Sequence, residues 1–176
     1  MAAASSTELK AHEGVTFRAV PVTSQGSVLE EWIDVLDVVA RHDMILASGH
    51  VTMDEAVAVF ELARSRGVTR LLVNHPLMSF LGWRDEHVEQ LVDLDVYLEV
   101  GVLADHLGDQ GKESPTTRLA RLYPESLLVF GSDLGHQLYP EVIPGITTWL
   151  EQSAHSIGES ALDHITTTNG KGLLLP

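Results

Sequence analysis

Two histidines and one aspartate each follow a short apolar segment of the sequence. His50 comes just after the run MILAS, His75 just after TRLLV, and Asp133 just after LLVF. Imidazole nitrogens and carboxylate oxygens are ligands of Zn²⁺ and Mn²⁺. The chain has no cysteine, so a metal site must use His, Asp and Glu. We therefore expect a divalent metal, Zn or Mn, to be held by these three side chains.

Three further polar residues lie near the same segment ends and are weaker candidates for binding a substrate. Asn74 directly precedes His75, while His106 and His136 lie in neighbouring predicted loops. A single histidine at a strand end is more often a loop residue or a capping group than a metal ligand, and Asp133 alone could cap the next helix. A purely structural role therefore stays open for His50, His75 and Asp133, as it does for His106 and His136. The remaining histidines are expected at the surface: His12, His42, His87, His155 and His164.

Helices are expected between the apolar segments, because the chain alternates short apolar runs with stretches of helical periodicity. Parallel strands need such crossover helices, so this alternation predicts an α/β fold with a parallel sheet. The carboxyl ends of parallel strands share one edge of the sheet, which would let the candidate ligands converge. The predicted strands are 15–22, 44–48, 69–73, 96–100 and 127–130. The predicted helices are 27–41, 52–66, 85–92, 114–122 and 159–168. One more helix is predicted through Ile146, Trp149 and Leu150.

Local signals fix several of these boundaries. Thr52 and Glu55 have the spacing of a capping box, and Gly67 marks the end of the helix that they begin. Ser114 followed by Pro115 is typical of an N-cap with proline in the first helical position. Residues 24–27 have the composition of a turn.

Composition limits the domain organisation and the partners. The chain has 176 residues, of which 44% are hydrophobic, enough for one domain with a core. We expect a flexible N-terminal tail over residues 1–14 and a single α/β domain over residues 15–176. The net charge of −14 argues against nucleic acid and against an anionic membrane surface as partners. No membrane span or signal peptide is recognisable, so the expected location is the cytoplasm.

Several short motifs together resemble the later strands of the amidohydrolase superfamily, nearest to its phosphotriesterase-like metal-dependent hydrolases. These motifs are LASGH, LVNHP, the pair Leu98-Glu99, and GSDLG, with Asn169-Gly170 and the final leucines resembling the family's closing helix. The resemblance implies a (β/α)8 barrel with a metal centre. It would place His50 after the fifth strand, His75 after the sixth and Asp133 after the eighth.

The same resemblance implies that only half of a barrel is present. The family's first-strand His-x-His pair has no counterpart here, and neither does its fourth-strand bridging residue. A complete barrel takes about 250 residues. We therefore expect a partial TIM-like (β/α) barrel that corresponds to the C-terminal half of the family's domain.

The expected activity is hydrolysis of a small-molecule substrate. A metal-activated water would attack an ester, lactone, amide or phosphoester, and Asp133 would act as the catalytic proton acceptor. Asn74 or Ser132 would help to orient the substrate or a ligand.

A different function follows if the metal site is incomplete. A half-barrel leaves strand edges unpaired, so the chain would then be a non-catalytic binding or assembly subunit. Its partner would be a second copy, first of all in a homodimer, or another chain that supplies the missing barrel half. A third possibility is that the sequence is a piece of a longer enzyme.

Overall fold

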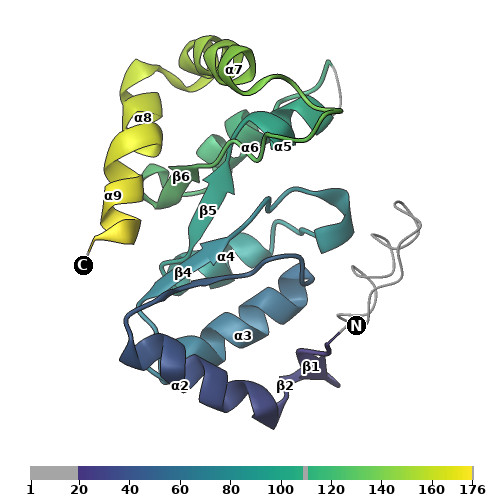
Figure 1. Ribbon diagram of the computed structural model, residues 1–176, viewed down its shortest axis with the longest axis vertical. Helices are drawn as coiled ribbons and strands as arrows, with labels where there is room; N and C mark the ends of the chain where they lie inside the picture. Colours follow the sequence, from purple (N-terminus) through teal and green to yellow (C-terminus); the bar gives the residue numbers. More distant parts are fainter. Residues whose placement is uncertain (1–19, 109–110, 176) are drawn as a thin grey trace. The chain divides into compact units, whose positions relative to one another are not determined.

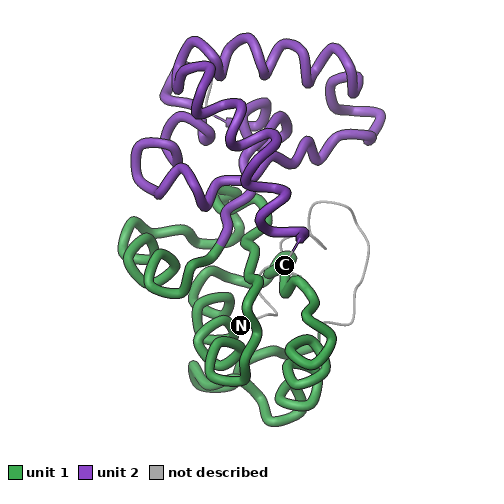
Figure 2. Tube along the Cα trace, turned by 90° about the vertical axis from the view of Figure 1, so that its left-hand side faces the viewer, with its two compact units in different colours: residues 1–96 green, residues 97–176 purple. Residues whose placement is uncertain are grey.

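The computed structural model describes residues 20–108 and 111–175, which form a mixed α/β structure (Figure 1). The chain divides into two compact units, residues 1–96 and 97–176 (Figure 2). The tail expected over residues 1–14 lies outside the described residues. The single domain expected over residues 15–176 stays a prediction.

The first described element is a small antiparallel hairpin of β1 (Thr23–Ser24) and β2 (Ser27–Val28). Its two turn residues, Gln25 and Gly26, both have positive φ angles, as in the type I′ turn that suits the twist of a hairpin. The turn expected at 24–27 is thus confirmed. The strand expected over 15–22 is wrong for its described residues 20–22, since Pro21 has no N–H to donate to a ladder.

The following helix begins later than the sequence predicts. Residues 27 and 28 pair in the hairpin, so the predicted start of the helix at Ser27 is wrong. A single 3₁₀ turn over Glu30–Trp32 leads into α2 (Ile33–Arg41). The indole N–H of Trp32 donates to the carbonyl of Pro21 at 3.0 Å, which fixes the entry to the helix.

Two parallel strands and two helices make up the rest of the first unit. β3 (Ile45–Ala47) pairs with β4 (Arg70–Val73), and the register places Ala47 opposite Leu72. Both strands and the helix between them lie where the sequence predicts. That helix is α3 (Met53–Ser65), and α4 (His87–Asp93) follows β4 after a 3₁₀ turn at Ser79–Leu81.

The expected capping box begins α3. Glu55 N donates to the Thr52 hydroxyl at 3.4 Å, and the Glu55 carboxylate accepts from Thr52 N at 3.1 Å. The other Glu55 oxygen accepts from the Thr23 hydroxyl at 3.1 Å, so the same buried carboxylate also ties the hairpin to α3. Gly67 ends the helix with a φ of 89°.

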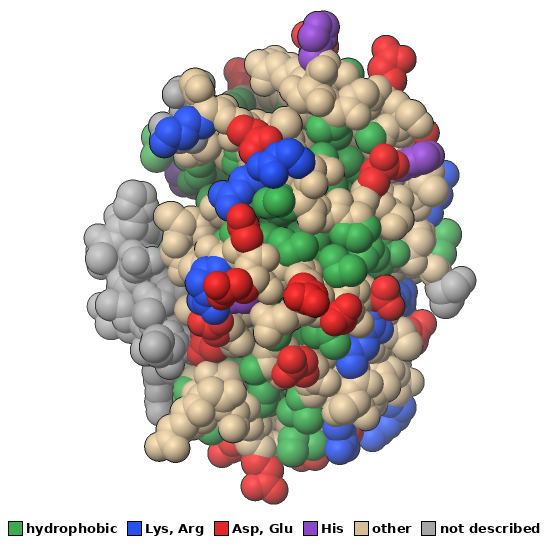
Figure 3. Space-filling model, turned by 180° about the vertical axis from the view of Figure 1, so that it is seen from behind, with side chains coloured by type: hydrophobic (Ala, Val, Ile, Leu, Met, Phe, Trp, Pro, Cys, Tyr) green, Lys and Arg blue, Asp and Glu red, His purple; other side chains and the backbone are tan. Residues whose placement is uncertain are grey.

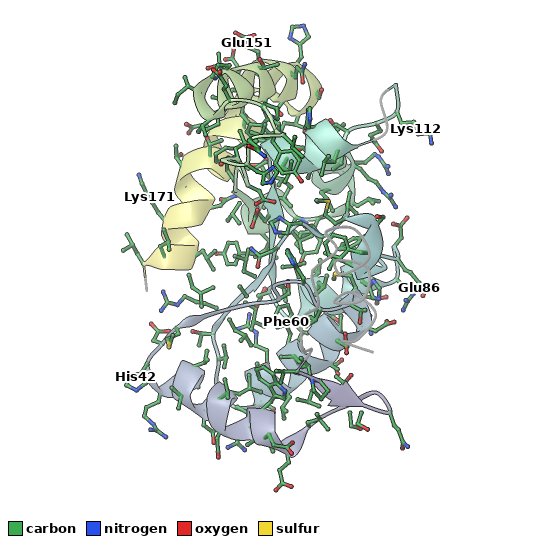
Figure 4. The ribbon with its side chains drawn as sticks, turned by 45° about the vertical axis from the view of Figure 1, so that its right-hand side comes forward. His42, Phe60, Glu86, Lys112, Glu151 and Lys171 are labelled. Carbon is green, nitrogen blue, oxygen red and sulfur yellow. The ribbon has the colours of Figure 1, made fainter. Side chains whose placement is uncertain are left out.

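The apolar side of α3 forms the centre of the first unit's core. Phe60, labelled in Figure 4, is almost completely buried on this side of the helix. The other large buried side chains of this unit come from α2, α3, β4, the 3₁₀ turn at Ser79–Leu81 and α4: Leu36, Met53, Leu71, Val73, Leu81 and Leu91.

The second unit repeats the arrangement of paired parallel strands with helices. β5 (Tyr97–Val100) pairs with β6 (Leu128–Phe130), both at the predicted positions. The helices expected around 114–122 and through Trp149 are confirmed, with Ser114 as N-cap. The six-residue helix at 102–107 was not predicted. The helices are α5 (Val102–Leu107), α6 (Pro115–Leu122) and α7 (Val142–Ile157).

The C-terminal helix continues beyond its predicted end at Thr168. It consists of α8 (Glu159–Asp163), a π-helical turn (His164–Thr168) and α9 (Asn169–Leu174). The hydroxyl of Thr167 bonds back to the carbonyl of Asp163 at 2.6 Å, a contact that often accompanies distortion of a helix. The buried amide of Asn169 then donates to the carbonyls of Glu125 and Leu128, which attaches α9 beside β6.

The structure thus confirms the α/β class with parallel strands that alternate with helices. Within the described ranges, each unit holds one pair of parallel strands and neither closes into a barrel. The TIM-like half-barrel stays a prediction. Among residues 20–108 and 111–175, no helix combines the length and the apolar character that crossing a bilayer requires.

Candidate metal site

The loops that follow β3 and β4 are joined to each other by hydrogen bonds. Gly49 N donates to the side-chain oxygen of Asn74 at 3.3 Å, and Asn74 N donates to the hydroxyl of Ser48 at 3.1 Å. Ser48 N also donates to the carbonyl of Leu72 at 2.8 Å, which extends the β3–β4 ladder by one step. Asn74 therefore fixes the spacing of the two loops that carry the candidate histidines.

His75 has an uncommon backbone conformation. Its φ angle of 46° lies in the left-handed region, which few non-glycine residues adopt. Its carbonyl accepts from Met78 N at 2.9 Å, which closes the turn after β4. Across from it, Gly49 has a φ of 56° in the turn after β3, where glycine adopts this conformation without steric cost.

The structure brings His50 and His75 together. Their ring centroids are 5.5 Å apart with an interplanar angle of 51°, and Phe80 packs edge-on against His50 at 5.4 Å. The strand register explains this proximity, because the two histidines follow the paired residues Ala47 and Leu72 by the same number of positions. His50 is exposed and His75 is half-buried.

This spacing fits two ligands of one metal ion. With zinc–nitrogen bonds of about 2.1 Å at tetrahedral angles, two imidazoles on one ion have ring centroids about 5 Å apart. Within the described part of the chain, however, no group of three or more His, Asp or Glu side chains is arranged to hold a metal ion. The structure thus brings together two of the three predicted ligands, and their binding of a metal stays a prediction.

The third predicted ligand, Asp133, belongs to the second unit. It is exposed, follows β6 in the run Gly131-Ser132-Asp133, and has a φ of 48°. Its metal-binding and catalytic roles stay predictions.

Glu99 lies close to the same end of β6. A Cβ placed on Gly131 would come within 2.6 Å of the Glu99 carboxyl group, so only glycine leaves room for this carboxylate. Glu99 is half-buried on β5. The sequence shows an acidic residue in a predicted strand. It does not show that the Glu99 carboxylate lies against Gly131, two positions before Asp133.

The weaker candidates occupy ordinary structural positions. His136 is exposed, its Nδ1 accepts from Leu138 N at 3.3 Å, and its ring packs against Tyr139. His106 is exposed on α5. Their expected roles in substrate binding stay predictions.

His87 was expected at the surface, and this prediction is wrong. Its side chain is only 1% exposed, because the apolar face of α4 turns it towards the N-terminus of α3. Its Nδ1 accepts from Arg84 N at 3.0 Å, and its Nε2 lies 3.1 Å from an Asp54 carboxylate oxygen. Both ring nitrogens are thus engaged, and the Nε2 contact links α4 to α3.

Asp54 is the charged centre of this contact. Its carboxylate accepts two hydrogen bonds from the Arg84 guanidinium as well as the contact from His87. The bonds from Arg84 and then His87 lower the pKa of Asp54 to about 2. No sequence motif indicates this cluster, since its members come from different elements.

Comparison with known protein families gives one match. Residues 1–99 match DUF6282, a family of unknown function, and this is more than half of the chain. The chain belongs to DUF6282. The segment shared with DUF6282 contains His50, Asn74 and His75, whereas Asp133 lies beyond it. Comparisons with curated proteins and with solved structures find no match.

Proposed function

We propose that this protein is a metal-dependent hydrolase in which His50 and His75 bind zinc or manganese. The observation that carries the proposal is the pair of imidazoles at the carboxyl ends of two paired parallel strands, with ring centroids 5.5 Å apart. Functional residues collect at this end of the strands in parallel α/β proteins.

The bound metal would supply a Lewis acid and an activated water for attack on an ester, lactone, amide or phosphoester. The residues of the chain have separate tasks. His50 and His75 bind through ring nitrogens, and Asn74 fixes the distance between their loops. Asp133 would complete the ligand set and would accept a proton at its carboxylate, as the resemblance to the amidohydrolase superfamily implies.

The half-barrel architecture remains part of the proposal. It is supported by two pairs of parallel strands with helices between the strands, one pair before residue 96 and one after it. The proposed substrate is a small molecule. The acidic surface, of which Figure 3 shows one face, disfavours highly anionic substrates.

The alternative is a non-catalytic assembly subunit that pairs with a second copy of the chain. The observation that favours it is the apolar character of the outer side of α2, where Val35 and Val38 are each more than two-fifths exposed. Light scattering at micromolar concentration tests this alternative. A dimer that Val35→Asp with Val38→Asp converts to monomer supports it, whereas a monomeric parent chain contradicts it.

Hydrolysis itself is tested with the full chain loaded with Zn²⁺ or Mn²⁺. Nitrophenyl esters, a lactone, an anilide and a nitrophenyl phosphodiester represent the four substrate classes. We expect turnover of at least one class, a loss of about 100-fold or more in His75→Ala and Asp133→Asn, and no change in His155→Ala. Absence of turnover in the metal-loaded chain would contradict the hydrolase assignment.

A further inference from the structure

The second unit contains a pocket of about 650 Å³. This volume lies in the range of sites that bind small molecules. Its lining residues come from α5, from the segment before α6 and the first turn of that helix, and from α7 with the residues that precede it. Its apolar lining comes from Val102, Pro115, Pro140, Pro144 and Trp149.

A carboxylate lies in this apolar wall. One oxygen of Asp105 accepts from Thr116 N at 2.8 Å, and the other accepts from the Trp149 indole N–H at 2.9 Å. The ring of Trp149 is itself held against Phe130, with centroids 4.8 Å apart. The Asp105 carboxylate is therefore held in position by residues of α6 and α7.

No cation of the described residues pairs with this carboxylate. Its contacts are neutral donors from Ser114, Thr116 and Trp149, and burial outweighs them and raises the pKa of Asp105. Of the other charged residues in the pocket lining, Glu113 pairs with Arg121, and Lys112, labelled in Figure 4, is exposed. A partly buried carboxylate that has no positively charged partner favours a ligand that carries a positive charge.

Apart from the exposed His106 and Lys112, the rest of the lining also favours a cation over an anion. The first backbone N–H groups of α6 are already used, because Asp105 accepts from Thr116 N and Ser114 accepts from Thr117 N. The start of this helix therefore offers no free donors to an anion. One face of α7 adds neutral oxygen atoms that can accept hydrogen bonds: Thr148, Gln152, Ser153 and Ser156.

We propose that this pocket binds a small organic cation, a protonated amine with an apolar body. The ammonium group pairs with the Asp105 carboxylate, and the apolar body packs against Trp149 and the prolines. The site lies wholly in the second unit and outside the segment that matches DUF6282. It does not depend on the proposed hydrolase activity.

Benzylamine is a suitable probe, with benzyl alcohol and phenylacetate as neutral and anionic partners of similar shape. Each is titrated into the ¹⁵N-labelled full chain, and the indole N–H signal of Trp149 reports binding because this group donates to Asp105. We expect a saturable shift with benzylamine, binding about ten-fold or more weaker for benzyl alcohol, and none for phenylacetate. Equal binding of the amine and the alcohol, or no saturable shift with benzylamine, overturns the proposal.

Variants on α7 locate the binding site without touching Asp105. Thr147 and Thr148 are both exposed on α7, but only Thr148 belongs to the pocket lining. Thr148→Phe should fill the pocket and weaken benzylamine binding about ten-fold or more, whereas Thr147→Phe should leave it unchanged. Asp105→Asn should remove the preference for the amine over the alcohol. A preference that survives in Asp105→Asn, or equal effects of the two phenylalanine variants, contradicts the proposed site.

Discussion

The imidazole rings of His50 and His75 lie 5.5 Å apart between centroids, although each follows a different strand. Their proximity follows from the register of β3 and β4, in which Ala47 is opposite Leu72. Two turns with left-handed residues, Gly49 and His75, end the strands at matching levels. The pair is thus a consequence of strand pairing, and the hydrogen bonds of Asn74 hold the two loops together.

Asn74→Ala should weaken metal binding more than it weakens the fold. It removes the side-chain oxygen that accepts from Gly49 N. The distance between the loops that carry His50 and His75 is then no longer fixed by this bond. Loss of such a supporting contact typically costs about 10- to 100-fold in metal affinity. Calorimetric titration with Zn²⁺ measures the affinity, and urea unfolding measures the stability. An unchanged affinity would show that Asn74 does not position the pair.

Glu55→Ala should destabilise the first unit by about 2 kcal/mol, because it removes the carboxylate half of the capping box and the bond from Thr23 together. Glu61→Ala is the matched control, since Glu61 is exposed on the same helix. Urea unfolding followed by circular dichroism compares the two variants. Equal midpoints for both would contradict the role given to Glu55.

The ion pair at Asp54 should contribute stability that depends on pH in the acid range. The folded pKa of about 2 lies below the ordinary value of 3.8, so the contribution is complete above pH 4 and is lost as the pH falls towards 2. Asp54→Asn should remove this part of the pH dependence of the unfolding midpoint. The charged groups facing Asp54 are Arg84 and His87. If Asp54→Asn keeps the full pH dependence of the unfolding midpoint between pH 4 and 2, Asp54 is not the source of that dependence.

Asn169→Ala should destabilise the second unit by about 2 kcal/mol. It removes both hydrogen bonds from the buried amide and leaves the carbonyls of Glu125 and Leu128 without that donor. Thr168→Ala, at an exposed neighbouring position, should change stability by less than about 0.5 kcal/mol. Thermal unfolding provides the comparison, and similar melting temperatures for the two variants would refute the anchoring role.

Elements with strong local signals were predictable from the sequence. The capping box of Thr52 and Glu55 and the Ser114-Pro115 start of α6 depend only on residues close in the chain. The parallel strands have apolar runs that cannot be left exposed. The adjacency of His50 and His75 was also predictable, because it requires only that consecutive strands pair in parallel.

Features that depend on distant partners were not predictable. Ser27 and Val28 continue the helical pattern of α2 but pair in a hairpin instead. His87 is buried because Arg84 and Asp54 satisfy its two nitrogens, and nothing in its neighbouring sequence shows this. Asp105 is a member of a pocket only because α6 and α7 bring Thr116 and Trp149 to it.

Zinc titration of the full chain, followed by calorimetry and by the imidazole signals of His50 and His75, tests the central claim most directly. We predict about one bound ion per chain, shifts confined to these two histidines among the nine, and loss of binding in His50→Ala and in His75→Ala but not in His155→Ala. Binding that survives both substitutions, or no binding by the parent chain above pH 7, would contradict the proposed metal site.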